Sequence, residues 1–200
     1  MSRAAVVLAV LAVLSLLVSG VGTRGKWFHF RVGLALFALS GLLGFIALVL
    51  GFLSSNWIAC AIGALLLLPA IYGALTAFGK PMIHDISTDP SQLDPAVAAL
   101  QRKAYPEVQP LVLPVAARDA FARVRAAAES LGWTIVSASP DQGVLTATDT
   151  TGWFGFTDDV TVHVRAEGQG SRIDVRSTSR VGKSDVGMNA RRIRKFLGRL

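Results

Sequence analysis

Two long stretches of apolar residues occupy most of the first eighty positions, and their lengths predict membrane-spanning helices. Ala4 to Gly22 is interrupted by polar residues only at Ser15 and Ser19, so it supplies the roughly 20 residues that a 30 Å hydrocarbon core requires. The second stretch, Val32 to Gly79, contains no charged residue and as a single helix would extend about 72 Å at 1.5 Å per residue. Because no bilayer holds a helix of that length, the stretch must fold back on itself.

The reversal is predicted at Ser54-Ser55-Asn56, a polar, turn-forming segment in the middle of the second stretch. Trp57 follows it with the amphipathic ring that is favoured at membrane interfaces. The pattern therefore predicts three spans, at about 4–22, 32–53 and 57–78. A cleaved signal peptide is the alternative for the first span, because Arg3 precedes it and small residues lie near its end. No Asp, Glu, Lys, Arg or His lies within the spans, which does not favour an ion or proton pathway.

Residues 80–113 follow the apolar region with a sudden change to prolines and turn-forming acids, which is typical of loops. The segment contains Asp89-Pro90, Asp94-Pro95, Pro106 and Pro110. A short helix is predicted between Gln92 and Lys103, but the segment as a whole is interpreted as a loop-rich arm outside the core. The predicted organisation is thus 1–79 as the helical region, 80–113 as the arm and 114–200 as a folded domain.

Residues 114–200 begin and end with helical periodicity and alternate in between. Pro114 suits the first turn of a helix, and Gly132 ends an apolar stripe that includes Phe121 and Val124. Alternating apolar and polar residues then predict four strands, at about 133–139, 144–150, 156–165 and 171–180. A last helix, capped by Ser184 or Asp185, completes the domain. The order predicts an α+β fold, an antiparallel four-stranded meander flanked by two helices, beside the membrane α-helical region.

Composition agrees with this division and excludes several classes of site. The chain is 52% hydrophobic, above the roughly 45–50% of soluble domains, and all thirteen acidic residues lie from Asp85 onward. Cys60 is the one cysteine, so no intrachain disulfide or cysteine-based metal site can form. Nucleophile elbows, phosphate loops, dinucleotide fingerprints and zinc signatures are also missing from the sequence. We therefore predict no cofactor.

Several ordered motifs resemble a known family. They are Ile86-Ser87-Thr88-Asp89-Pro90, Gly132-Trp133, Thr151 to Phe156 with Asp158-Asp159, Asp174 to Ser177, and Asn189 to Ile193. Together they resemble the bacterial and plastid family called domain of unknown function 1499, over about residues 81–200. The paired prolines usual after the Ser-Thr-Asp-Pro motif are replaced here by Ser91-Gln92-Leu93-Asp94. The resemblance implies a membrane-associated protein and carries no established activity.

The end of the predicted sheet is the candidate ligand site. Ser177 and Ser179 continue the inward phase of Ile173 and Val175, where a simple core would have aliphatic side chains. The candidate ligand-binding residues are Trp153, Asp158, Ser177, Ser179, Arg180, Asp185 and Asn189. Apolar walls with a few convergent polar groups would form a pocket, whereas a polar network that fastens the last helix to the sheet is the alternative.

Two acidic groupings contain residue types that can serve catalysis or metal binding. Asp158 and Asp159 are adjacent in a strand and must point to opposite faces, so at most one enters a site, and pairing with Arg176 or Arg180 is the competing use. His84, Asp85 and Asp89 have the donor atoms for a cation. Because Asp85 and Asp89 stand in ordinary turn positions, the structural interpretation is preferred and no metal is predicted.

The last helix is predicted to carry a basic face. Arg191, Lys195 and Arg199 are spaced four residues apart and share one side, and Arg192 is predicted with them as a lipid or anion contact. Near an anionic membrane each such cation contributes about 1 kcal/mol, and a solvated face is the alternative. RNA binding is not favoured because no aromatic platform lies among these charges, so we expect no nucleic acid partner.

The function predicted from the sequence is that of a membrane-anchored, non-catalytic binding or scaffold module that contacts anionic lipid or an envelope protein partner. A hydrolase with a site around Asp158, Ser177, Arg180 and Asp185 is the alternative. The expected location is the bacterial inner (plasma) membrane with several spans. Basic residues in the loop at 23–31 predict that this loop, and with it the soluble domain, lies in the cytoplasm.

Overall fold

The structure is a computed structural model that describes residues 2–200, and the chain divides into two compact units. The first contains the helices up to Phe78 together with the loop Thr151–Gly155. The second contains Gly79–Thr150 and Phe156–Leu200. Each unit is described by itself.

The first unit contains three long apolar helices. They are α1 (Ser2–Arg24), α2 (Phe30–Leu53) and α3 (Trp57–Ala77). All three are long and apolar enough to cross a membrane. The predicted reversal is present, because α2 ends at Leu53 and the side chain of Asn56 accepts a hydrogen bond from the amide of Ala59 at 3.1 Å, which starts α3.

Small residues let α2 and α3 approach closely. Gly44 and Gly63 are buried where the two helices meet. A Cβ atom at Gly44 would lie 3.0 Å from the Cβ of Leu66, and one at Gly63 would overlap the carbonyl oxygen of Gly44. Such contacts between backbones are typical of helices that associate in a bilayer, where packing replaces the hydrophobic effect.

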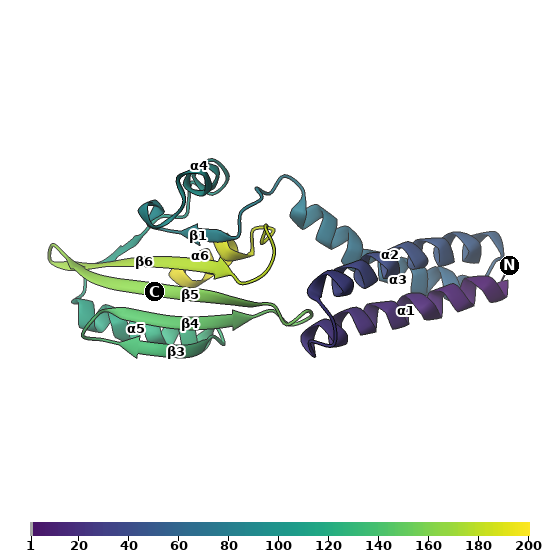
Figure 1. The fold of residues 1–200 in the computed structure, drawn as a ribbon, viewed down its shortest axis with the longest axis horizontal. Coiled ribbons are helices and arrows are strands. Elements are labelled where there is room, and N and C mark those ends of the chain that lie inside the picture. Colours follow the sequence, from purple (N-terminus) through teal and green to yellow (C-terminus); the bar gives the residue numbers. More distant parts are fainter. Residues whose placement is uncertain (1) are drawn as a thin grey trace. The chain divides into compact units, whose positions relative to one another are not determined.

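The second unit is a six-stranded antiparallel sheet with helices on one face and at one edge (Figure 1). The strands are β1 (Asp85–Ser87), β2 (Leu111–Leu113), β3 (Thr134–Ser139), β4 (Val144–Thr150), β5 (Thr157–Glu167) and β6 (Gly170–Ser179). The helices are the 3-10 turn η1 (Pro90–Gln92), α4 (Pro95–Ala104), α5 (Ala117–Ser130) and α6 (Met188–Leu197). The strand order is β1-β6-β5-β4-β3, and β2 also pairs with β6. The predicted α+β fold is confirmed, and β3 to β6 form the predicted meander.

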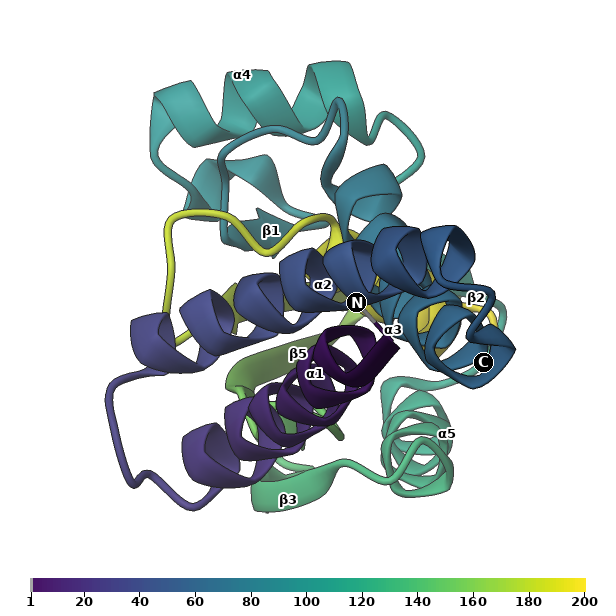
Figure 2. The ribbon, with the colours of Figure 1, turned by 90° about the vertical axis from the view of Figure 1, so that its right-hand side faces the viewer.

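The helices α5 and α6 cover the apolar face of the meander, and α4 lies next to β1 at the edge opposite β3 (Figure 2). Val160, Val162 and Val175 point into the core from the strands. From the other side, Trp133 stacks on Phe196 of α6 with ring centroids 4.9 Å apart. The last helix is therefore held to the sheet by apolar packing as well as by the polar contacts described below.

The segment predicted as an arm outside the core is part of the domain instead. Its two short strands pair with β6, and Ile83, Ile86, Tyr105 and Val108 are buried in the core. Without β1 and β2, the outer edge of β6 would present unpaired backbone groups. The same pairing explains why α5 begins at Ala117 rather than at Pro114, because the residues just before Pro114 form β2. Three-residue strands are too short for alternation to reveal them.

Candidate functional site

Arg192 stands at the centre of a buried polar network beneath α6. Its side chain is 4% exposed, because it projects from the same side of α6 as Ile193 and Phe196, which are buried. Its Nε donates to Asp149 Oδ2 at 2.7 Å, and its Nη2 donates to Asp158 Oδ2 at 2.7 Å. Two carboxylates therefore balance a guanidinium that would be very costly to bury alone.

The other nitrogen of Arg192 binds the polar groups that join α6 to β6. Its Nη1 donates to Ser177 Oγ at 2.9 Å and to Asn189 Oδ1. The Ser177 hydroxyl in turn donates to Asn189 Oδ1 at 2.7 Å. Asn189 Nδ2 donates to Ser179 Oγ at 3.0 Å and to the carbonyl oxygen of His84 at 2.9 Å. The hydrogen-bonding groups in this layer are thus paired with one another, which is how buried polar groups avoid a desolvation penalty.

Asp185 organises the beginning of α6. Its carboxylate accepts hydrogen bonds from the amides of Gly187 at 2.8 Å and Asn189 at 2.7 Å, so it serves as the predicted cap although Gly187 occupies the position just before the helix. Burial raises the pKa of Asp185 above its usual range, against the lowering effect of the two amide hydrogen bonds. The Asp185 side chain therefore fixes the first turn of α6 through these two amide contacts.

The structure brings together five of the seven predicted ligand-binding residues. Asp158, Ser177, Ser179, Asp185 and Asn189 lie in or next to the network. Trp153 belongs instead to the loop that groups with the helical unit, and it is 46% exposed. Arg180 lies outside the network and pairs with Asp159 at 2.6 Å, an exposed contact that lowers the pKa of Asp159 through charged hydrogen bonds.

The buried network matches the fastening interpretation rather than an open pocket lined by Ser177 and Asn189. Both of these residues have 0% exposure, so a substrate has no access to the Ser177 hydroxyl, and that hydroxyl donates to an amide oxygen rather than to a general base. Asp158 points inward and Asp159 outward, as the alternation requires. The residues of the hydrolase alternative are thus not assembled into a nucleophile and its base.

Asp85 and Asp89, the two carboxylates with donor atoms for a cation, serve separate structural roles. Asp85 accepts two hydrogen bonds from Arg176, at 3.0 and 2.6 Å, and Asp89 accepts from the Ser91 hydroxyl at 2.6 Å, which lowers the pKa of Asp89. Among residues 2–200, no group of three or more histidine, cysteine, aspartate or glutamate side chains could hold a metal ion. We therefore assign Asp85 and Asp89 to the attachment of β1 and its following turn.

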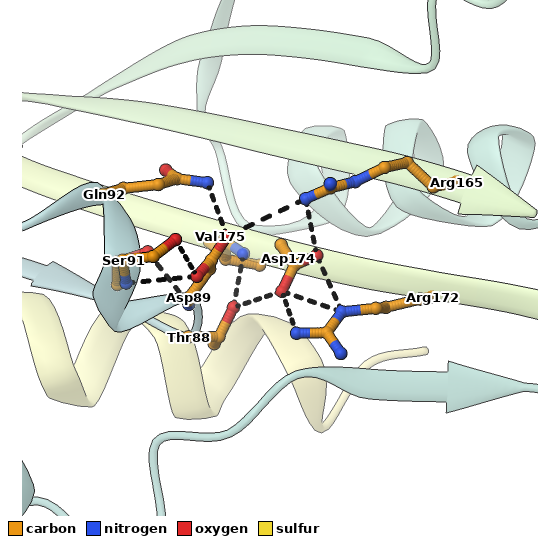
Figure 3. A network of polar contacts seen from close by, with 9 residues as sticks. Thr88, Asp89, Ser91, Gln92, Arg165, Arg172, Asp174 and Val175 are labelled. Carbon is orange, nitrogen blue, oxygen red and sulfur yellow. Dashed lines mark hydrogen bonds and ion pairs between the residues drawn. The ribbon is translucent and has the colours of Figure 1, made fainter. Parts of the chain in front are cut away.

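A second polar network, which the sequence did not reveal, surrounds Asp174 on β6 (Figure 3). This residue occupies the outward phase of the strand but is 1% exposed. Its carboxylate accepts from Arg172 Nε at 3.0 Å and Arg165 Nη2 at 3.1 Å. Thr88 donates to it at 3.4 Å and accepts from the amide of Val175 at 2.8 Å. Two of the motifs that suggested the family, around Thr88 and Asp174, therefore meet in space, and their role here is to hold the β1 segment against β6.

The basic face of α6 differs from its predicted composition at one position. Arg191, Lys195 and Arg199 are exposed, and within the described chain none of them forms an ion pair. The prediction that Arg192 belongs to this face is wrong: Arg192 faces the core because its partners Asp149 and Asp158 lie beneath the helix. Arg194 pairs with Glu107 at 3.0 Å. The unpaired basic surface is therefore Arg191, Lys195 and Arg199, and we call it the basic surface below.

Each residue of the basic surface borders a hollow between α6 and neighbouring elements. The first hollow has a volume of about 200 Å³, with apolar walls from Leu131, Trp133 and Met188. Its charged lining consists of Asp149, Arg191, Arg192 and Lys195. The second hollow has a volume of about 360 Å³ and is bordered by Arg123, Ser130 and Arg199, among others. Cations beside apolar walls are suited to anionic groups that carry hydrocarbon.

Comparison with known proteins identifies the family but supplies no activity. Residues 85–200 match the family described as "Protein of unknown function (DUF1499)". No match is found among curated proteins. The matched region begins at β1 and includes the sheet, α5, α6 and both polar networks, and it covers more than half of the chain. This confirms the resemblance seen in the sequence motifs, and the chain therefore belongs to the DUF1499 family.

Proposed function

We propose that this protein is a membrane-anchored, non-catalytic module whose sheet domain binds the headgroups of anionic lipids through the basic surface. The observation that carries the proposal is the contrast between cations on one helix. Arg192 is buried and neutralised by two carboxylates, whereas Arg191, Lys195 and Arg199 are exposed without an acidic partner in the described chain. Unpaired cations that border hollows are available to an external anion.

The short link between α3 and β1 allows individually weak contacts to be sufficient for lipid binding. Only residues 78–84 separate the end of α3 from β1, and this link extends at most about 25 Å at 3.3–3.6 Å per residue. A domain held that close to a bilayer meets lipid at high effective concentration. Three cations at about 1 kcal/mol each then contribute about 3 kcal/mol, a factor of about 10² in occupancy, since 1.4 kcal/mol corresponds to tenfold.

The proposal includes the bacterial inner membrane as location and the cytoplasm as the side of the sheet domain. Arg24, Lys26 and Arg31 lie at or near the connection between α1 and α2, and short basic loops stay cytoplasmic. Two further spans return the chain to the same side, where the leaflet surface carries negative potential. A phosphatase fused after Leu200 should be inactive and a fluorescent protein there should fluoresce; active phosphatase would place the domain outside.

The lipid contact is tested with the full-length protein in nanodiscs of phosphatidylcholine, with and without phosphatidylglycerol. We expect amide hydrogen exchange in residues 188–200 to slow several-fold when phosphatidylglycerol is present, and high salt to remove the effect because it screens surface charge. The variant R191E/K195E/R199E should lose the protection.

The matched control is R102E/K103E/R118E, which changes the net charge equally at exposed positions outside the basic surface. It should keep the protection. Equal exchange in both kinds of disc would refute lipid binding. Protection that appears only in native membranes, and in neither disc, would indicate a protein partner instead.

A further inference from the structure

We infer that the first hollow, between α6, the end of α5 and the end of β4, is a specific seat for one phosphate ester group that carries a hydroxyl and an apolar neighbour. This inference rests on the proposed function and deepens it, because it assigns the anion to one hollow rather than to the whole basic surface. Charge, volume and lining each contribute to the assignment.

The charges of the lining select an anion. Three cations and one carboxylate border the hollow, a net charge of 3 − 1 = +2. Arg192 already pairs with Asp149 and Asp158, so the cations left for a ligand are Arg191 and Lys195. They stand four residues apart on α6 and therefore project from the same side of the helix. A phosphate ester carries one or two negative charges, which these two side chains match.

The volume selects a headgroup rather than a whole lipid. A hollow of about 200 Å³ has the volume of about six or seven water molecules at roughly 30 Å³ each. Sites for complete drug-sized ligands begin at about 300 Å³. A phosphate with two or three attached carbon atoms is therefore the size of ligand that the hollow accepts, and any acyl chains must remain outside it.

The walls and the carboxylate give the site its chemical selectivity. Trp133 is fixed by its stacking on Phe196, and Met188 is an adaptable apolar side chain, so carbon next to the phosphate finds a preformed apolar wall. Asp149 gives its Oδ2 to Arg192 and is about a third exposed, at 32% of its side chain. Because Oδ2 is the oxygen that binds Arg192, we assign Oδ1 to accept a hydrogen bond from a ligand hydroxyl, and the carboxylate would repel a ligand that offered only anionic oxygen.

Trp133 provides a local readout in the complete protein. Full-length protein labelled with 5-fluorotryptophan has four fluorine resonances, one for each tryptophan, and the Trp133→Phe variant assigns the relevant one. The probes are phosphatidylglycerol added to phosphatidylcholine nanodiscs and, separately, soluble glycerol 3-phosphate or inorganic phosphate. We expect phosphatidylglycerol to shift the Trp133 resonance saturably. A shift with glycerol 3-phosphate as well would support the seat and show that the ester need not be part of a lipid.

Paired variants separate a specific seat from diffuse attraction. R191Q/K195Q removes the two available cations of the first hollow and should weaken the Trp133 response at least tenfold. R102Q/K103Q removes two exposed cations outside the basic surface and should leave that response unchanged. Equal losses of the Trp133 response in the two variants would overturn the seat. A Trp133 resonance that shifts with none of the probes would also overturn it.

The two measurements separate the inference about the first hollow from the proposed lipid binding. If exchange in residues 188–200 still slows with phosphatidylglycerol while the Trp133 resonance does not move, lipid binding stands and the seat is overturned. If neither responds, both are overturned. A response to inorganic phosphate equal to that of glycerol 3-phosphate would overturn the roles assigned to the hydroxyl and the apolar walls.

Discussion

Replacing Arg192 by methionine removes the charge at the centre of the buried network while nearly preserving side-chain volume. Asp158 would remain with a side chain only 5% exposed and, within residues 2–200, without an ion-pair partner. Asp149, at 32% exposure, would instead regain water. Ser177 and Asn189 would each lose one charged donor. The cost should therefore come mainly from the Asp158 carboxylate.

The expected loss is about 3–5 kcal/mol in the free energy of unfolding, the range for breaking a buried ion pair by removing one partner. Domains of this size are stable by about 5–15 kcal/mol, so the variant should be close to the limit of folding. Replacing both charges, as R192M/D158L, should recover most of the loss because no buried charge remains unpaired. R191M, on the exposed side of the same helical turn, should change stability by less than about 0.5 kcal/mol.

The assay is urea unfolding of the full-length protein in a mild non-ionic detergent, with brief protease digestion to measure the fraction of folded sheet domain. A loss below about 1 kcal/mol for R192M would refute the central role of the ion pairs. If the double variant is as unstable as R192M, the stability came from side-chain packing or from the Ser177 and Asn189 contacts, and the reasoning about Asp158 is wrong.

Three further predictions test the domain, a turn and a buried carboxyl. Residues 80–200 expressed alone should be soluble and unfold cooperatively, because they contain a complete core; an insoluble fragment from a folded full-length chain would contradict this. Gly143 and Gly168 both have positive φ, at 65° and 58°, and G168A, with open space around the new Cβ, should cost about 1–2 kcal/mol. G143A should cost more, because its Cβ would overlap the Val164 carbonyl; equal urea midpoints would exclude that overlap. The pKa of Asp185 is raised in the folded state, so its contribution to stability is lost as the pH rises from the usual 3.8 through the folded value. The free energy of unfolding of D185N should therefore increase relative to that of the wild type over this pH range. A difference between the two proteins that does not change with pH would refute the prediction.

Local patterns in the sequence determined much of the fold. The three long helices, the reversal before Trp57, and the four-residue turn Pro140–Gly143 between β3 and β4 all depend on residues close together in the chain. The two short strands β1 and β2 do not, because each is defined by pairing with β6, and Ile86 lies opposite Ser177, which is 91 positions later. A three-residue strand that pairs with a distant segment is too short to show the alternation of apolar and polar residues that predicts a strand.

The candidate site shows the same division. Helical spacing placed Arg191, Lys195 and Arg199 on one side of the last helix, and they are exposed. The spacing could not separate Arg192 from them, because its burial depends on Asp149 and Asp158 from the preceding hairpin, 43 and 34 residues earlier. Sequence alone therefore determined which residues are charged and which share a helix face. Only the tertiary structure decided which of those charges are neutralised, because that depends on which distant carboxylates the sheet places beneath the helix.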